Sequence, residues 1–195
     1  MPTYMGEEEV IKKNMALAQE QNYTVEDMEA MPEDVRAELI DGRIYYMAAP
    51  STTHQRLLTF LVVNIWNFVS KHKGNCQVYP APLAVYLNKD NRTYLEPDLI
   101  VVCDSSKMDE KGCHGAPDMI AEIVSPSTRS RDYLLKLTKY QNAGVREYWI
   151  LDTAGNVIQV YDFEHGNVFT YGWDDKIRMS ILEDLEIDFS EFSRS

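Results

Sequence analysis

The sequence predicts a mixed α/β fold, or α+β on a strict definition, in which helices flank a mixed β-sheet. Apolar residues recur at helical spacing between Leu57 and Val69. Short apolar runs typical of buried strands occupy residues 95–102, 119–124 and 147–152. The elements follow in the order helix, hairpin, helix, strands, helix, strand and β-rich tail, without the regular alternation of a fully parallel sheet.

The length and composition indicate a single globular domain. The chain has 195 residues, and its 45% hydrophobic content is enough for one core. We expect residues 1–23 to form a helical extension and residues 24–195 to form the domain. The formal charge of −12 argues against non-specific binding to polyanions, because lysine and arginine are what attract phosphates.

The cysteines and the apolar runs bear on the cellular compartment. Cys76, Cys103 and Cys113 are odd in number and show no CxxC spacing, so neither a disulfide framework nor a paired zinc site is expected. A reducing compartment fits this pattern. The first residues are acidic where a secretory signal would be basic and then apolar, and no run approaches membrane-spanning length. We therefore expect a cytoplasmic protein without a membrane segment.

The first elements are helices followed by a hairpin. An exposed helix is expected over residues 7–21, and the hydroxyl of Thr24 caps a short second helix. Two β-prone runs then surround Asp41 and Gly42, a dipeptide that accepts positive φ at little cost. This pattern predicts a hairpin over residues 37–47.

The next elements are a long helix and an interrupted strand. Thr52 and Gln55 have the spacing of a capping box, and the core helix behind them is expected to end near Lys71. The following β-prone run contains Pro80 and Pro82, which lack amide donors. That composition favours an edge or bulged strand.

The second half of the chain continues the mixed pattern. Residues 104–117 are charged and contain Gly112 and Gly115, which predicts a loop. A solvated connection is favoured over a loop whose tip moves over a site. Residues 130–143 predict a core-packed helix, and Gly144 suits its left-handed C-cap. Residues 156–163 and 167–171 predict a β-rich tail.

Two acids stand out against apolar strands. Asp98 follows Pro97 at the mouth of a strand, and an acid there is costly to bury without a partner. Glu122 interrupts another strand and shares one face with Ile120 and Val124, because side chains alternate along a strand. Two carboxylates on neighbouring strands suit a hard cation such as magnesium or manganese.

A lysine on the following helix completes the predicted site. Lys136 lies one helical turn before Tyr140, and its flexible stem can follow apolar surface toward the sheet. Its charge would orient a nucleophilic water or stabilise a charged transition state. No organic cofactor is predicted.

These residues resemble the core motif of the restriction-endonuclease-like PD-(D/E)XK superfamily, which is a proline-aspartate followed by a strand with an acid, one residue and a lysine. Asp98 and Glu122 match this motif, and Val124 stands at the lysine position. More closely, residues 24–163 resemble the Uma-type family of putative restriction endonucleases, a domain of unknown function. The matching stretches are AELIDG, MAAPSTTH, EPDLIVV, AEIVSPSTR and KLTKYQNAGVREYWILD.

The resemblance implies a restriction-endonuclease-like fold and a Mg- or Mn-dependent endonuclease acting on DNA, despite the negative net charge. In the Uma-type family the lysine of the superfamily motif lies on the helix after the strand, and the resemblance assigns this lysine to Lys136. It assigns the metal ligands to Asp98 and Glu122. Glu38 and His54 lie in the family-like stretches and are possible supports of the metal site. A homodimer is expected from the need to cut two strands.

Structural readings compete with this interpretation. Asp98 can cap a turn, and Glu122 can pair with Arg129 or Arg131 at a strand edge. Asp118 also follows a proline, and a turn role is favoured for it over metal support. A zinc site at Cys113-His114 is disfavoured, because the other cysteines lie in β runs.

Two further alternatives concern surfaces. A locally basic stretch suggests a phosphate-facing patch, although a solvated helix face is the usual explanation. Its members are Arg129, Arg131, Lys136, Lys139 and Arg146. The alternative to an enzyme is a non-catalytic binding or regulatory module that keeps the fold and engages a protein partner, which an acidic surface favours.

Overall fold

The structure is a computed structural model that describes residues 22–32, 34–72, 74–126 and 128–194. The helix predicted over residues 7–21 lies outside the described residues. Across the described segments, none of the helices has the length and apolarity needed to cross a bilayer.

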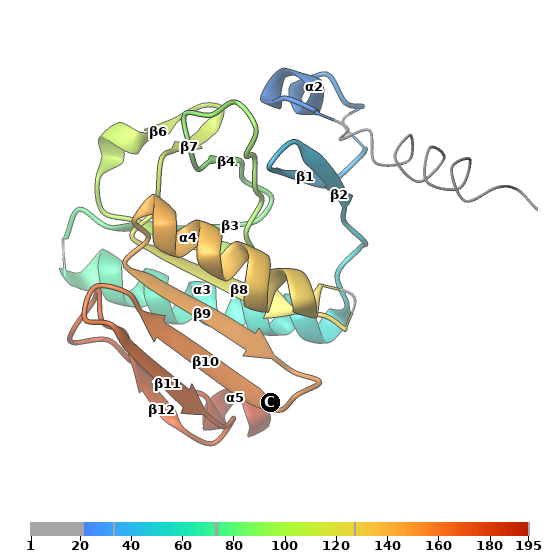
Figure 1. Ribbon diagram of the computed structural model, residues 1–195. Coiled ribbons are helices and arrows are strands. Elements are labelled where there is room, and N and C mark those ends of the chain that lie inside the picture. Colours follow the sequence, from blue (N-terminus) through green and yellow to red (C-terminus); the bar gives the residue numbers. More distant parts are fainter. Residues whose placement is uncertain (1–21, 33, 73, 127, 195) are drawn as a thin grey trace, which may run out of the picture.

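A mixed six-stranded sheet forms the centre of the described chain, as predicted (Figure 1). Its strand order is β11-β10-β9-β8-β5-β3, and every neighbouring pair is antiparallel except the parallel pair β8 and β9. β8 and β9 are buried along their whole length, which explains their continuous apolar runs. The strands are β3 (Gln77–Pro80), β5 (Leu99–Val102), β8 (Met119–Val124), β9 (Glu147–Asp152), β10 (Val157–Asp162) and β11 (Asn167–Tyr171).

Helices cover the two faces of this sheet (Figure 1). On one face lies α3 (Thr52–His72), whose buried stripe packs against Leu99, Val101 and Trp149. The opposite face carries a π-helical segment, η2 (Arg131–Lys136), that continues into α4 (Leu137–Ala143). Successive residues of the central strands alternate between the core on the α3 side and the core on the α4 side. The two-residue period of a strand therefore assigns each side chain to the correct face.

The predicted ends of the helices hold with one exception. Gly144 has φ of 92° and ends α4 in the left-handed region. The short helix α2 (Val25–Glu29) has the predicted cap at Thr24, including a full capping box with Asp27. The cap of α3 is Ser51 and not Thr52, because the amide of His54 donates to Ser51 Oγ at 3.1 Å.

The predicted hairpin is present beside the sheet. It consists of β1 (Ala37–Ile40) and β2 (Arg43–Tyr46), and its turn residues Asp41 and Gly42 have φ of 52° and 78°. The hairpin carries Glu38 on a fully buried strand, β1, and so brings a charge toward the sheet.

The prediction of a loop over residues 104–117 is wrong in part. This segment forms η1 (Ser105–Lys107), β6 (Met108–Asp109) and β7 (Gly112–His114), and β7 pairs in parallel with β4 (Val85–Tyr86). The strands are two or three residues long, too short to give a period in the sequence. The C-terminal tail adds β12 (Lys176–Arg178), β13 (Glu186–Asp188) and α5 (Ser190–Arg194).

The cysteine prediction is wrong. Cys76 and Cys103 form a disulfide, and the remaining cysteine, Cys113, is buried and free. β3 and β5 pair with Gln77 opposite Val102, so the two bonded cysteines face each other one step beyond that pair. Register across a sheet brings them together, and spacing along the chain does not reveal it. The argument for a reducing compartment loses the basis it had in unpaired cysteines.

Candidate active site

Asp98 and Glu122 meet where the start of β5 lies beside the end of β8, two neighbouring strands in the interior of the sheet. β5 and β8 are antiparallel with Leu99 opposite Ala121, so Asp98 stands opposite Glu122 one step further along. Both side chains line a cavity of about 780 Å³. The structure therefore brings the two predicted carboxylates to one concave site.

Two groups orient the carboxylate of Asp98. The backbone amide of Ile123 donates to Oδ2 at 2.7 Å, and Nε2 of His54 lies 3.0 Å from Oδ1. His54 comes from the first turn of α3, which begins at the cavity. Asp98 is thus held from both sides and does not simply cap a turn.

Glu122 is buried and paired with the next helix. Its Oε1 accepts hydrogen bonds from Lys136 Nζ at 2.8 Å and from the hydroxyl of Tyr140 at 2.7 Å. Burial raises the pKa of Glu122, against the opposing attraction of Lys136. The alternative pairing of Glu122 with Arg129 or Arg131 is not what the structure shows.

Lys136 is surrounded by carboxylates. Its Nζ lies 2.8 Å from Glu38 Oε1, 2.8 Å from Glu122 Oε1 and 3.5 Å from Asp132 Oδ1. Burial disfavours the charged form, but the attraction of these acids outweighs it and raises the pKa of Lys136 above its ordinary range. Lys136 therefore stays protonated and is no general base at neutral pH.

Glu38 joins the hairpin to this cluster. Besides Lys136, its Oε1 accepts from the amide of Glu96 at 3.2 Å. Its Oε2 lies 3.9 Å from Nε of Arg131, whose guanidinium stacks on Tyr45. Glu38 therefore lines the same cavity as Asp98 and Glu122, and its support of a metal site stays a prediction.

The donor set fits a divalent cation. Four buried acids line the cavity, Glu38, Asp98, Glu122 and Asp132, and the positive charges that pair with them come from Lys136 and Arg131. Burial raises the pKa of Glu122 and of Asp132, so protons offset part of the negative charge that a cation would balance. Glu38 Oε2 and Asp132 Oδ1 are buried without a hydrogen-bond partner. Among the described residues no three acids, histidines or cysteines form a ready metal cage. Two carboxylates with water and substrate oxygens are the usual arrangement for magnesium.

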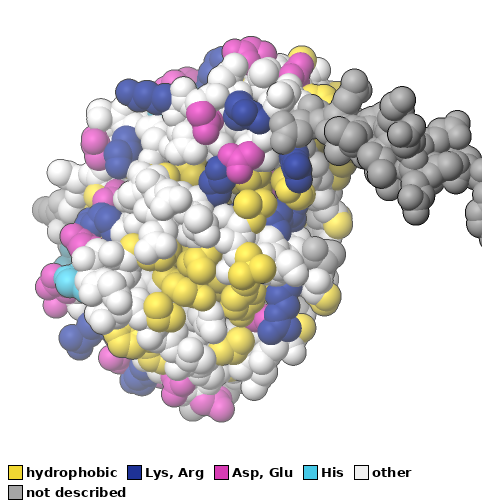
Figure 2. Space-filling view, viewed as in Figure 1, with side chains coloured by type: hydrophobic (Ala, Val, Ile, Leu, Met, Phe, Trp, Pro, Cys, Tyr) yellow, Lys and Arg dark blue, Asp and Glu magenta, His cyan; other side chains and the backbone are white. Residues whose placement is uncertain are grey.

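The basic stretch forms no phosphate-facing patch. Each of its members is paired with a carboxylate: Arg129 with Asp152, Arg131 with Glu38, Lys136 with the cluster above, Lys139 with Asp41, and Arg146 with Asp118 and Glu164. Figure 2 shows the face that carries α4, where basic and acidic side chains alternate at the margin and hydrophobic ones gather in the middle. Among the side chains coloured there, no continuous basic area appears.

The remaining candidates have structural roles. Asp118 accepts from the amide of Cys103 at 2.7 Å and pairs with Arg146. These contacts join distant segments and are not those of a turn, and Asp118 does not line the cavity. His114 pairs with Asp109, and Cys113 is buried in the core beneath. The disfavoured zinc site is not formed by these residues.

The sequence reasoning missed part of the site. Asp132 lies four residues before Lys136, and Tyr140 lies four residues after it, so both share its side of the helix. That spacing was the available signal. The cavity wall formed by residues 46–51 was not predicted as part of the site, although residues 47–51 belong to the family-like stretch MAAPSTTH.

Comparisons with known proteins identify the family and the fold. A family model described as "Uma2: Putative restriction endonuclease" matches residues 25–189. The uncharacterized protein slr1290 of Synechocystis sp. is 26% identical over 125 residues, which are 64% of this chain and 64% of that protein, so the chain covers less than two thirds of that relative.

A solved structure shares the fold. The crystal structure titled "a putative nuclease belonging to DUF820" from Anabaena variabilis has a TM-score of 0.71 to this chain at 19% identity. The match covers 86% of this chain and 96% of that one. At this identity the likeness shows the fold alone.

Proposed function

The chain belongs to the Uma2 family, and from this premise we propose that it is a magnesium- or manganese-dependent nuclease that hydrolyses phosphodiester bonds in DNA. The observation that carries the proposal is the position of Asp98 opposite Glu122 within one cavity. Oxygen ligands from two strands match the preference of hard cations. The fold is shared with a solved protein titled a putative nuclease, which favours the same reaction class by analogy alone.

In this proposal Asp98 and Glu122 hold the cation. When bound there, the cation supplies Lewis acidity toward a phosphate oxygen and an attacking water. His54 and the amide of Ile123 fix the direction of the Asp98 carboxylate, so little reorganisation is needed when the substrate arrives. These two groups are positioning groups.

Lys136 acts through its charge. Its ammonium lies against Glu122 and Glu38 and offsets the repulsion among the acids. The same positive charge favours the additional negative charge that develops on the phosphoryl group during hydrolysis. Because Lys136 remains protonated, its role is electrostatic and not that of a base.

A cleavage assay with isosteric variants tests the proposal. Purified protein with manganese should cut labelled DNA, and Asp98→Asn and Glu122→Gln should each lose this activity because a neutral amide is a poor ligand for a hard cation. Glu186→Gln, which changes an exposed acid on β13, is the matched control and should retain activity. Equal residual cutting by all four proteins would indicate contamination and reject the proposal.

A non-catalytic module is the second candidate. The ion pairs of the cavity favour this candidate. Each arginine and lysine that lines the cavity is paired with a protein carboxylate, and a paired cation binds a phosphate less readily. Calorimetry with manganese separates the two: a module predicts no cation site that depends on Glu122. Loss of manganese binding in Glu122→Gln, with retention in Glu186→Gln, would exclude the module as the whole explanation.

A further inference from the structure

The cations around the cavity are already engaged. Arg36 pairs with Glu96 at 3.0 Å, Arg131 lies beside Glu38, and Lys136 is held by three acids. A duplex is bound chiefly through phosphates that meet free lysine and arginine side chains. The cavity therefore offers little of what duplex DNA requires.

One wall of the cavity is apolar and ends in an exposed aromatic ring. The segment 46–51 lines it, and Tyr46 is 71% exposed at the end of β2. Leu58, Pro82 and Pro126 add further apolar surface to the lining. Flat aromatic and apolar surfaces bind unpaired bases by stacking, which needs no phosphate contact.

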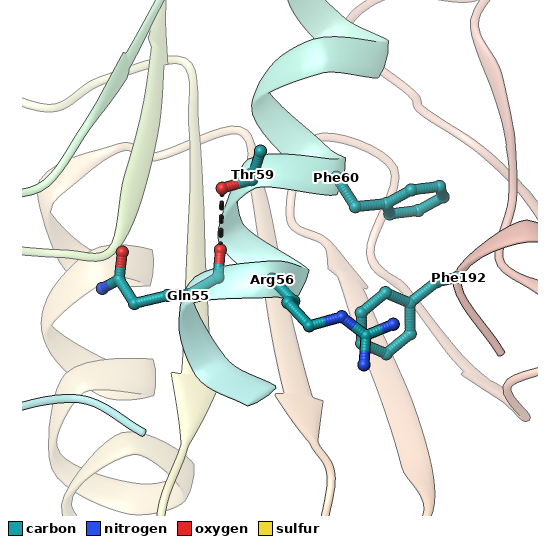
Figure 3. Close-up of a pocket in the computed structure, with 5 residues that line it drawn as sticks. All are labelled: Gln55, Arg56, Thr59, Phe60 and Phe192. Atoms are coloured by element: carbon teal, nitrogen blue, oxygen red, sulfur yellow. Dashed lines mark hydrogen bonds between the residues drawn. The ribbon is translucent and has the colours of Figure 1, made fainter. Parts of the chain in front are cut away.

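A second depression adjoins this cavity. Gln55 lines both, and the second has a volume of about 390 Å³. Figure 3 shows Arg56 lying across Phe192 of α5, with Phe60 beside them on α3. The rings of Phe60 and Phe192 are 5.8 Å apart, and the Arg56 guanidinium is 5.3 Å from the Phe192 centroid.

This pairing of rings and a guanidinium is typical of platforms for single strands. Bases stack on aromatic faces, and arginine adds cation–π and charge contributions. Residues 54–60 of α3 span about 9 Å at the ordinary rise of a helix, so the two depressions are near neighbours. A strand that leaves the cavity past Gln55 reaches the second depression directly.

We propose that the substrate is unpaired DNA: one nucleotide lies in the large cavity against Tyr46, and a neighbouring base stacks on the Arg56 guanidinium, which itself lies over the Phe192 ring. This inference rests on the proposed nuclease function and adds its substrate class. Asp98 and Glu122 are only 9% and 5% exposed, so a phosphate reaches them when its nucleotide leaves the base stack. Unpaired segments do this at the lowest cost.

Fluorescence anisotropy without added metal tests the proposal, because no cleavage then interferes. The probes are a labelled single-stranded oligodeoxynucleotide, the matched duplex and RNA of the same sequence. The single DNA strand should bind about tenfold more tightly than the duplex. Tyr46→Ala should weaken this binding by about tenfold, the scale of one lost stacking contact, and Tyr46→Phe should keep it.

The controls separate stacking from folding. Tyr46 is exposed, so its replacement leaves the core intact. Trp66→Ala removes an exposed aromatic side chain from α3, outside both depressions, and should not change binding. Arg56→Ala should weaken binding several-fold, because it removes the guanidinium from the second platform.

The outcomes also distinguish this inference from the nuclease proposal. Duplex or RNA bound as tightly as single-stranded DNA, or Tyr46→Ala binding like the parent, would overturn the inference. Cleavage of duplex DNA that depends on Glu122 would keep the nuclease proposal while this one fails. Strand binding that depends on Tyr46 without any cleavage would support this inference and reject the nuclease proposal.

Discussion

At the scale of single residues, Lys136 has the largest energetic role in the site. It is buried with three carboxylates around its ammonium, and each of those acids is itself buried. Removing one member of a buried ion cluster leaves uncompensated charge, which costs far more than the loss of a surface pair. The cluster is therefore expected to couple the hairpin, the sheet and the helix energetically.

Replacement of this lysine tests that coupling. Lys136→Met should lower the free energy of unfolding by about 3–5 kcal/mol, because three acids lose their counterion. Lys139→Met is the matched control. Lys139 lies three residues after Lys136 and pairs with the exposed Asp41, so its replacement should lower the free energy of unfolding by less than about 1 kcal/mol. Urea denaturation measures both, and similar costs for the two variants would refute the role given to Lys136.

Glu147 predicts a pH dependence away from the site. Burial raises its pKa, although its hydrogen bonds with Ile181 and Trp149 oppose the shift. Because the folded state binds this proton more tightly than the unfolded chain does, the protonated carboxyl group contributes its full stability at acid pH. This contribution is lost as the pH rises through the raised pKa of the folded state. Relative to the parent, Glu147→Gln should therefore gain stability from mildly acidic to mildly alkaline pH.

Denaturation curves of the two proteins across that range measure the effect. The exposed Glu186→Gln shows what the loss of one negative charge does by itself. If the free energy of unfolding of Glu147→Gln minus that of the parent stays constant or falls as the pH rises, the assignment is contradicted.

The sequence identified the principal acids because each breaks a local pattern. Asp98 follows a proline at a strand mouth, and Glu122 interrupts an apolar strand. Lys136 was reached through the resemblance, and the structure places it beside Glu122. Asp132 was not predicted, because an acid in a helical segment ordinarily faces solvent. Its spacing of four residues from Lys136 indicates a shared side of the helix, and the tertiary contacts show that this side is buried.

At the scale of elements, the π-helical segment η2 is the part of the helix that local pattern did not foresee. It carries Asp132 and Lys136, and the regular helix α4 follows directly. Wide helical turns of this kind are often found at functional sites. β8 and β9 were predicted at their full length because their apolar runs are continuous, whereas β5 begins at Leu99, four residues later than predicted. β6 and β7 are too short to leave a period.

The disulfide between β3 and β5 makes a prediction at this scale. It joins an edge strand to its neighbour across a sequence separation of 27 residues. Closing a loop of this length is worth about 3–4 kcal/mol in the chain-entropy model. Reductant should therefore lower the stability of the parent by about that amount and leave Cys76→Ser unchanged.

Urea denaturation with and without reductant measures this difference. Thiol titration of the unfolded, unreduced parent should detect Cys113 alone, since the other two cysteines are bonded. Three reactive thiols, or equal responses of the parent and Cys76→Ser to reductant, would contradict the bond.

At the scale of the whole molecule, the negative net charge limits how much of nucleic-acid binding can come from phosphate contacts. The chain has a formal charge of −12, and the basic residues of the cavity are paired with acids. Recognition by stacking then predicts a weak dependence on salt. The composition implied this limit, but the sequence alone did not show that the locally basic stretch is neutralised. The homodimer expected from the need to cut two strands stays a prediction.

The salt dependence of strand binding follows from that charge distribution. Each phosphate neutralised on a single strand contributes a slope of about −0.7 in log affinity against log salt. We expect a total slope no steeper than about −1.5, which corresponds to about two phosphates. Anisotropy titrations over a range of salt concentrations measure it, and a slope typical of many phosphate contacts would argue for a binding surface other than the cavity.

The central claim is that Asp98 and Glu122 together hold a divalent cation. Anomalous diffraction from crystals soaked in manganese tests it most directly. The account predicts one manganese peak within ligand distance of both carboxylates, about 2 Å, and no such peak in Glu122→Gln. A peak at another acid, or an unchanged peak in Glu122→Gln, would contradict the assignment of the site.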